Sequence, residues 1–356
     1  MISPRLAAML AAVVGALIVA LGAWLIIGSP GTVDGPEAYA PRTPAGDAVE
    51  VTVEDGDSPS DIADKLETSG AIESGTQFRV LVQLMGYDRL LQAGTYELAR
   101  GSTALEVIFR MKEGIVSQRA VTVIEGWQLG EIADAVAELG IPREDFIAAT
   151  QDHLYDFTFV HVIQEGESLE GYLYPATYSL RGTDTGRDVV IEMLSGFAEN
   201  VPVDEVTAQA AEVGLSLHEV LTIASVIERE AVVPEERPIM AQVFLSRLFQ
   251  EDQPMEADPT VQYALAQDPA NVAQFGYWKQ RLTTDDLAHD SPYNTYVYGG
   301  LPPGPICSPS LASINAVLNP SDTEFLYFVA RDDGSHAFAE TFDEHQQNVA
   351  EIQGGG

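Results

Sequence analysis

The chain has 356 residues, enough for two domains and a sizeable core, and its 54 acidic and 18 basic residues give a formal net charge of −36. Nucleic acids and anionic lipid headgroups bind positively charged surfaces, so this charge argues against both as partners. The single cysteine, Cys307, excludes an intramolecular disulfide.

The N-terminus is predicted to anchor the protein in a membrane. Residues 6–28 contain no charge and no proline, and a helix of this length, about 34 Å, spans a bilayer. A cleaved signal peptide is the alternative, because residues 38–40 (AYA) resemble a cleavage site. However, the apolar stretch is too long and the cleavage site too distant for a signal peptide. We therefore expect residues 1–5, with Arg5, to be cytoplasmic and the bulk of the chain to lie outside the cell membrane.

A linker and an internal repeat follow. Residues 29–48 carry four prolines among Gly, Ala and Thr and are predicted to be a linker. Residues 51–56 (VTVEDG) and 121–126 (VTVIEG) are related at an offset of 70, and each is followed by an amphipathic helical pattern. Each copy predicts a strand, a glycine turn and a helix, and two copies are too few for a solenoid. We expect a small βα module over 49–117 and a larger domain over 118–352.

The larger domain is predicted to be mainly helical after Glu170. Helices are expected near 186–199, 203–213, 216–231, 234–250, 255–267 and 311–319. Residues 325–330 and 336–339 are predicted to form a terminal hairpin. The predicted fold class is therefore α+β.

One predicted helix places a carboxyl group on its buried face. At about 100° per residue, the apolar face holds Leu217, Leu221, Ala224, Glu228 and Ala231, and a polar stripe holds His218, Thr222, Ser225 and Arg229. Burial penalises a carboxylate and favours the protonated acid, which can then act in proton transfer near neutral pH. The non-catalytic alternative is an interior helix whose Glu228 reaches solvent at an edge. By helical periodicity alone Glu230 is also a candidate for the catalytic acid, because it shares a helix face with Ile223 and Val226.

Three other segments carry polar or aromatic residues of interest. Asp258 begins a helix in an Asp-Pro-Thr sequence, where helix capping alone would explain it. Residues 291–296 (SPYNTY) offer two aromatic rings and an amide, a combination that can stack on sugar faces and bind hydroxyl or acetamido groups. A loop that merely packs its tyrosines is the alternative. Residues 300–306 (GLPPGPI) form a rigid turn that alone says little.

Taken in order, these segments resemble the endolytic murein transglycosylases, the MltG/YceG-like family. The resemblance rests on 224–230 (ASVIERE), Glu236-Arg237, 243–248 (VFLSRL), 258–261 (DPTV), 293–296 (YNTY), 300–306, 327–330 (YFVA), His336, Phe338 and His345. It covers the whole chain, including a LysM-like module at 49–117. Ala176 stands where the family usually has Asp, which weakens a substrate role for that position, and 307–310 (CSPS) replaces an Ala-Asn-Pro-Gly-like run.

The resemblance implies cleavage of the β-1,4 bond between N-acetylmuramic acid and N-acetylglucosamine within glycan strands, leaving a 1,6-anhydro end. Ordinary glycosidases need two carboxyl groups, but here the sugar's own C6 hydroxyl is the nucleophile. One acid can then protonate the leaving oxygen and afterwards accept the C6 proton. The family motif selects Glu228 for this role. Glu230 is then expected to be a structural residue or one that supports Glu228 from beside it. The residues predicted to shape the glycan cleft are Asp258, Asn294, Tyr296 and Glu170.

The resemblance also implies a single-pass protein of the cell membrane whose larger domain faces outward. It would act on peptidoglycan strands and limit their length during wall growth, with wall synthases as candidate partners. No cofactor or metal is expected, because the six histidines lack metal-binding spacing. A serine hydrolase would need a Gly-x-Ser-x-Gly elbow, and a pyridoxal-phosphate lyase a Schiff-base lysine, for which only three lysines are available. The main rival is a membrane-tethered scaffold that binds the wall without cleaving it.

Overall fold

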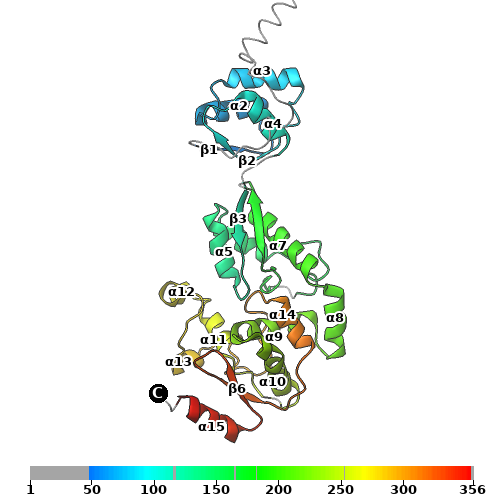
Figure 1. The fold of residues 1–356 in the computed structure, drawn as a ribbon, viewed down its shortest axis with the longest axis vertical. Helices are drawn as coiled ribbons and strands as arrows, with labels where there is room; N and C mark the ends of the chain where they lie inside the picture. The colour runs from blue at the N-terminus through cyan, green and yellow to red at the C-terminus, as the bar shows by residue number, and fades with distance from the viewer. Residues whose placement is uncertain (1–47, 115–117, 164–165, 182, 252, 354–356) are drawn as a thin grey trace, which may run out of the picture. The chain divides into compact units, whose positions relative to one another are not determined.

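A computed structural model describes residues 48–114, 118–163, 166–181, 183–251 and 253–353 (Figure 1). The predicted N-terminal segment, 1–5, membrane anchor, 6–28, and all but the last residue of the linker lie outside the described residues. In the described ranges no single helix is long and apolar enough to cross a membrane. The helices α8 (Val203–Glu212) and α9 (Leu217–Glu230) pass that test only as a pair, and the pair is bent by 92°.

The chain forms two compact units. The first extends to Gln118 and takes in Arg181–Thr183, and the second consists of Arg119–Leu180 and the residues from Asp184 onward. Each unit has a hydrophobic core of its own.

The first unit packs helices against a two-stranded antiparallel sheet. Its elements are β1 (Ala48–Val53), α2 (Pro59–Ser69), α3 (Gly75–Met85), β2 (Gly94–Ala99) and α4 (Ala104–Lys112). In the sheet Ala48 lies opposite Ala99 and Val53 opposite Gly94. Because successive side chains of a strand point to opposite faces, Val51 and Val53 both face the core, where they meet Leu66 and Phe78.

The second unit begins with a related strand and helix. Its first elements are β3 (Gln118–Thr122), α5 (Leu129–Glu138), α6 (Arg143–Thr150), β4 (Thr177–Arg181) and α7 (Gly186–Asn200), and β3 pairs with β4. The predicted strand, glycine and helix are confirmed in both copies of the repeat. Gly56 and Gly126 adopt positive φ values of 94° and 81°, a region that costs other residues energy, and both helices begin with a capping box.

The rest of the second unit surrounds α9. After α8 and α9 come η2 (Pro234–Glu236), α10 (Arg237–Phe249), α11 (Asp258–Leu265), α12 (Pro269–Phe275), α13 (Thr284–Leu287), α14 (Leu311–Leu318), β5 (Tyr327–Ala330), β6 (His336–Ala339) and α15 (Phe342–Gln353). Helices α8, α10, α11 and α14 all contact α9. The predicted terminal hairpin is confirmed, with Tyr327 opposite Ala339, and so is the α+β class.

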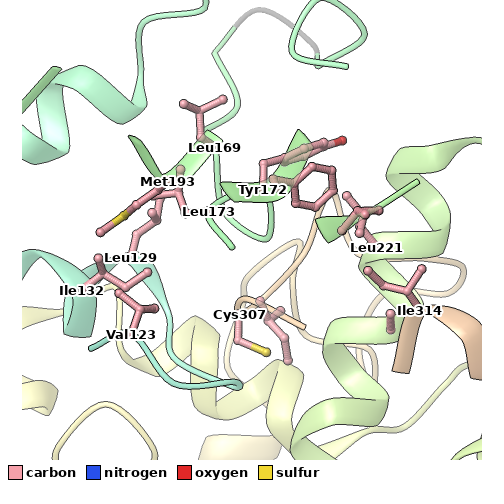
Figure 2. Packing of buried hydrophobic residues seen from close by; sticks show 14 of the residues in the cluster. Val123, Leu129, Ile132, Leu169, Tyr172, Leu173, Met193, Leu221, Cys307 and Ile314 are labelled. Atoms are coloured by element: carbon pink, nitrogen blue, oxygen red, sulfur yellow. The ribbon is translucent and has the colours of Figure 1, made fainter. Parts of the chain in front are cut away.

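The predicted polar stripe of α9 is wrong at two of its four positions, since His218 and Arg229 are partly exposed but Thr222 and Ser225 are not. Thr222 and Ser225 are as buried as the apolar residues around them, because α8, α10, α11 and α14 pack against α9. Their hydroxyl groups donate to carbonyl oxygens of the same helix, at His218 and Thr222 respectively, so both hydroxyl groups have a partner without contacting water. Figure 2 shows part of the surrounding core, with Leu221 of α9 and Ile314 of α14 on one side of Cys307 and Leu129 and Ile132 of α5 on the other.

Candidate active site

Glu228, near the end of α9, is held by the start of another helix. Its Oε2 accepts hydrogen bonds from the backbone N–H of Ser310 (2.9 Å), the Ser310 hydroxyl (2.5 Å) and the Ser313 hydroxyl (2.7 Å). Its Oε1 lies 3.4 Å from Nη2 of Arg237, and only 7% of its side chain is exposed. Ser310 is the N-cap of α14, so this carboxyl group faces the positive end of a helix dipole. These contacts describe a residue that fastens α14 and α10 to α9.

Glu230, two residues later, has a different environment. It is the last residue of α9 and is partly exposed. In the part of the chain that the structure describes, its carboxyl group makes no hydrogen bond or ion pair. Burial among protein atoms, together with repulsion from Asp258, raises its pKa to about 8. The carbonyl end of a helix also disfavours a negative charge. Glu230 is therefore a largely protonated acid at neutral pH that a ligand can reach.

Asp258 and Tyr296 lie beside Glu230. Asp258 is the first residue of α11, and its Oδ1 accepts a hydrogen bond of 2.8 Å from the Tyr296 hydroxyl. Both residues are exposed. Burial is the largest cause of the raised pKa of the Tyr296 phenol. The negative charges of Asp258, Glu230 and Glu256 are smaller causes, in that order. The structure thus brings two of the predicted cleft residues together, with Glu230 as their neighbour.

The backbone before Asp258 is strained. Glu256 has a φ of 51°, and in the described ranges it is the one residue other than glycine with a positive φ. Arg247 fixes this turn, because its Nη2 donates to the Glu256 carboxylate and its Nη1 to the carbonyl of Met255, both at 2.7 Å. Strain of this kind persists only where surrounding contacts enforce it, and it often accompanies functional sites.

Asn294, predicted to help shape the glycan cleft, has a supporting position within its own loop. Its side chain is fully buried. The amide group donates to the carbonyls of Leu287 (3.0 Å) and His289 (2.8 Å), and its oxygen accepts from the backbone N–H of Tyr296. The loop's own backbone therefore occupies the amide that we expected to bind sugar, and Asn294 shapes the loop that carries Tyr296.

Glu170, the last predicted cleft residue, is buried in the second unit, beside α5 and α11. Both of its oxygens lie within 3.1 Å of the backbone nitrogen of Leu129, at the start of α5, and Oε2 accepts from the Tyr263 hydroxyl at 3.3 Å. Burial raises its pKa to about 8. Its side chain lines a cavity of about 510 Å³.

The GLPPGPI turn is tied to α9 through His218. The His218 ring contacts the carbonyl of Pro303 through Nε2 (2.8 Å) and the Tyr172 hydroxyl through Nδ1 (3.0 Å). Further along, the backbone N–H of Ile306 donates to the Ser225 hydroxyl at 3.0 Å. These contacts give the turn a structural role, which its sequence alone did not indicate. Among the described residues, no three His, Cys, Asp or Glu side chains are arranged to hold a metal ion.

Comparisons with known proteins place this site in context. A sequence profile of the YceG-like family matches residues 51–351. A protein from Bacillus subtilis (strain 168) called endolytic murein transglycosylase is 33% identical over 316 residues, which cover 84% of this chain and 83% of that protein. One of the same name from Streptococcus pneumoniae (strain ATCC BAA-255 / R6) is 30% identical over 331 residues, covering 85% of this chain and 58% of that protein.

A solved structure is similar as well. The crystal structure of a yceG-like protein from Listeria monocytogenes matches with a TM-score of 0.54 and 30% sequence identity, over 85% of this chain and 99% of that one. The similarity is therefore one of fold as well as sequence.

Proposed function

The chain belongs to the YceG-like family, and from that premise we propose that it is an endolytic murein transglycosylase. It cleaves the β-1,4 bond between N-acetylmuramic acid and N-acetylglucosamine within peptidoglycan strands and leaves 1,6-anhydro ends. The relatives that carry this name, at 30–33% identity over most of this chain, support the proposal. The reaction is a lyase reaction, since no water is consumed.

The acid that we propose is Glu230, and its environment carries the proposal. A catalytic acid must be protonated, reachable and free to give its proton to the substrate. Glu230 is partly exposed, has no hydrogen-bonding partner in the described ranges, and has a pKa raised to about 8 by burial and by Asp258. Glu228, which the sequence motif favoured, accepts three hydrogen bonds through one oxygen. Its catalytic role stays a prediction, which the experiment below can still decide.

In the proposed reaction one carboxyl group performs both proton transfers. The Glu230 O–H protonates the glycosidic oxygen while the bond from C1 to that oxygen breaks, and the C6 hydroxyl attacks C1. The resulting Glu230 carboxylate then accepts the C6 proton, which restores the acid. The transition state carries positive charge at C1, which the Asp258 carboxylate can stabilise. The same negative charge disfavours ionisation of Glu230 before substrate arrives.

We extend the proposal to the rest of the chain. Residues 49–117 form a LysM-like module, residues 6–28 anchor the protein in the cell membrane with 1–5 in the cytoplasm, and residues 118–352 act outside it. The independent core of the first unit and the uncharged run at 6–28 support this arrangement. In this position the enzyme would limit strand length during wall growth, with wall synthases as partners.

The test is digestion of purified peptidoglycan by the full chain in detergent, with products resolved by mass spectrometry. We expect anhydro-ended fragments from the wild type and none above background from Glu230→Gln. The folded fraction of Glu228→Gln should keep full activity, but the variant should melt at a lower temperature. The uncharged amide cannot replace the carboxylate that pairs with Arg237 and accepts three hydrogen bonds.

The other outcomes separate the rival assignments. Loss of activity in a Glu228→Gln protein that is fully folded by circular dichroism, with Glu230→Gln still active, would reverse the assignment of the acid. Fragments with reducing ends would identify a hydrolase. Retention on peptidoglycan without any cleavage by the wild type would favour the wall-binding scaffold.

A further inference from the structure

The second unit contains a cavity that the proposed chemistry does not use. It has a volume of about 510 Å³ and lies among α5, α6, α11 and α12. This volume is within the range of about 300–1,000 Å³ that is typical of small-molecule sites. The residues that matter for its chemistry are Glu170, Tyr263, Tyr277, Gln128, Gln151 and Arg143.

Glu170 provides a buried polar group in this cavity. Only 3% of the residue is exposed. The N–H of Leu129 and the hydroxyl of Tyr263 already donate to it. With a pKa of about 8, caused mainly by burial, the group is mostly protonated at neutral pH. A protonated carboxyl group has a hydrogen of its own to donate, which a ligand's oxygen can accept.

Tyr277 provides an aromatic ring whose position is fixed. A Cβ atom at Gly130 would lie 2.4 Å from Cε1 of this ring, so the ring rests directly on the glycine backbone. The Tyr277 hydroxyl donates to Asp134 at 2.7 Å, and its carbonyl accepts from Nε2 of Gln128 at 3.4 Å. A ring held in this way is preorganised for stacking, since little side-chain freedom remains to be lost on binding.

The charge of the cavity selects among ligands. Arg143 is the one cation among the described lining residues, and Asp134 accepts from its Nε at 2.8 Å. No uncompensated positive charge is therefore available for a ligand carboxylate. The lining instead combines tyrosines, amides and a carboxyl group, the groups that bind uncharged hydroxyl and acetamido substituents while a ring stacks on the apolar face of a sugar.

We propose that this cavity is a binding subsite for an N-acetylated sugar ring of the glycan strand. The inference rests on the proposed function for its substrate, but it concerns binding and not bond cleavage. Carboxylate-bearing stem peptides are the other part of the same polymer, and the lack of a free cation disfavours them.

The experiment fills the cavity from an exposed position. Ala273 of α12 lines the cavity and is exposed, so Ala273→Trp occupies the space without disturbing the core. Ala270 lies on the same helix, is also exposed, and does not line the cavity, so Ala270→Trp is the matched control. Gln151→Trp, from α6's end of the cavity, is a second filling variant in case Ala273→Trp fails to fold.

Binding is measured by calorimetry on the full chain in detergent, in a Glu230→Gln background that prevents turnover. The probes are two uncharged N-acetylated sugars, chitotriose and chitotetraose, and a free stem peptide that carries carboxylates. We expect filling variants to weaken both sugars at least tenfold, the Ala270→Trp control to stay within twofold, and the stem peptide not to bind.

Two results would overturn the inference. One is unchanged sugar affinity in a folded filling variant, and the other is a stem peptide whose binding the filling variants abolish. Failure of the proposed function is seen separately, as the absence of anhydro products from wild-type digestion. A cleavage-inactive wild type with cavity-dependent sugar binding would leave the subsite in place.

Discussion

Replacing Asp258 by asparagine should move the pH dependence of activity without removing the acid. Asp258 repels negative charge on Glu230 and is the second cause, after burial, of the raised pKa of that residue. Asparagine keeps an oxygen that can accept from the Tyr296 hydroxyl. The substitution therefore removes the charge while the local contact can persist.

The size of the effect follows from how much of Glu230 is protonated. With a pKa of about 8, about 90% of the enzyme carries the acid at pH 7 and about 9% at pH 9, whereas an ordinary glutamic acid would be only about 0.3% protonated at pH 7. The environment thus raises the active fraction about 300-fold at pH 7. In Asp258→Asn the pKa falls, but it stays above the ordinary value of 4.5 because burial, the larger cause, is unchanged.

The assay is kcat/KM for peptidoglycan cleavage between pH 3.5 and pH 10, which reports the ionisation of the free enzyme. The wild type should show a single alkaline limb near pH 8, since one residue supplies both proton transfers, and a two-carboxyl glycosidase would instead give a bell. In Asp258→Asn the limb should move to lower pH. Tyr296→Phe is the control, because it retains the Asp258 charge and should leave the limb near pH 8 even if the rate falls. An unmoved limb in Asp258→Asn, or a wild-type limb near pH 4.5, would refute the reasoning.

Two further predictions concern stability. Because the folded pKa of Glu170 is about 8 and its ordinary value is 4.5, the folded state binds more protons in this window, and stability from this group falls as pH rises from 4.5 to 8. Between pH 5 and pH 8 the Tm of the Glu170→Gln variant should therefore fall by less than the Tm of the wild type. An equal fall in Tm for both proteins would contradict the burial argument. The Gly171→Ala variant should have a much lower Tm than the Gly214→Ala variant. Both glycines have φ near 80°, but a Cβ at Gly171 would lie 2.4 Å from Cβ of Pro305, whereas a Cβ at Gly214 would have no neighbour within 4 Å. Each left-handed alanine costs about 1–2 kcal/mol, and the clash adds about 1–3 kcal/mol, so similar thermal melts would be inconsistent with this packing.

Many of the helices could be predicted because the spacing of apolar residues that marks a helix can be recognised within one segment of the sequence. The helices α7, α8, α9 and α14 all lie close to their predicted ranges. Helix α15 was missed because its sequence, FDEHQQNVAEIQ, has few apolar residues. The polar stripe of α9 was misjudged for a related reason: Thr222 and Ser225 satisfy their own hydroxyl groups within the helix, so their polarity does not require water.

The environments of the candidate site residues could be predicted less well. Asn294 has an amide suited to sugars, yet its partners at Leu287 and His289 belong to the folded loop. Glu228 lies on the apolar face of its helix as expected, but the donors that hold it come from Ser310 and Ser313, more than 80 residues away. A helical pattern indicates that a carboxyl group is buried, but it does not indicate what the group meets there.

One local signal did distinguish the two glutamates. The helix was predicted to end at about residue 231, shortly before Pro234, so Glu230 lay at its carbonyl end and Glu228 one half turn earlier. A carboxylate at that end is disfavoured by the helix dipole, which favours the protonated form that an acid catalyst needs. Ser310 directly precedes the helix predicted at 311–319, and in the structure it is the N-cap of α14, where a helix N-terminus binds an anion. The two glutamates therefore face opposite ends of helix dipoles: Glu228 meets the amino end of α14, while Glu230 terminates α9 beside Asp258.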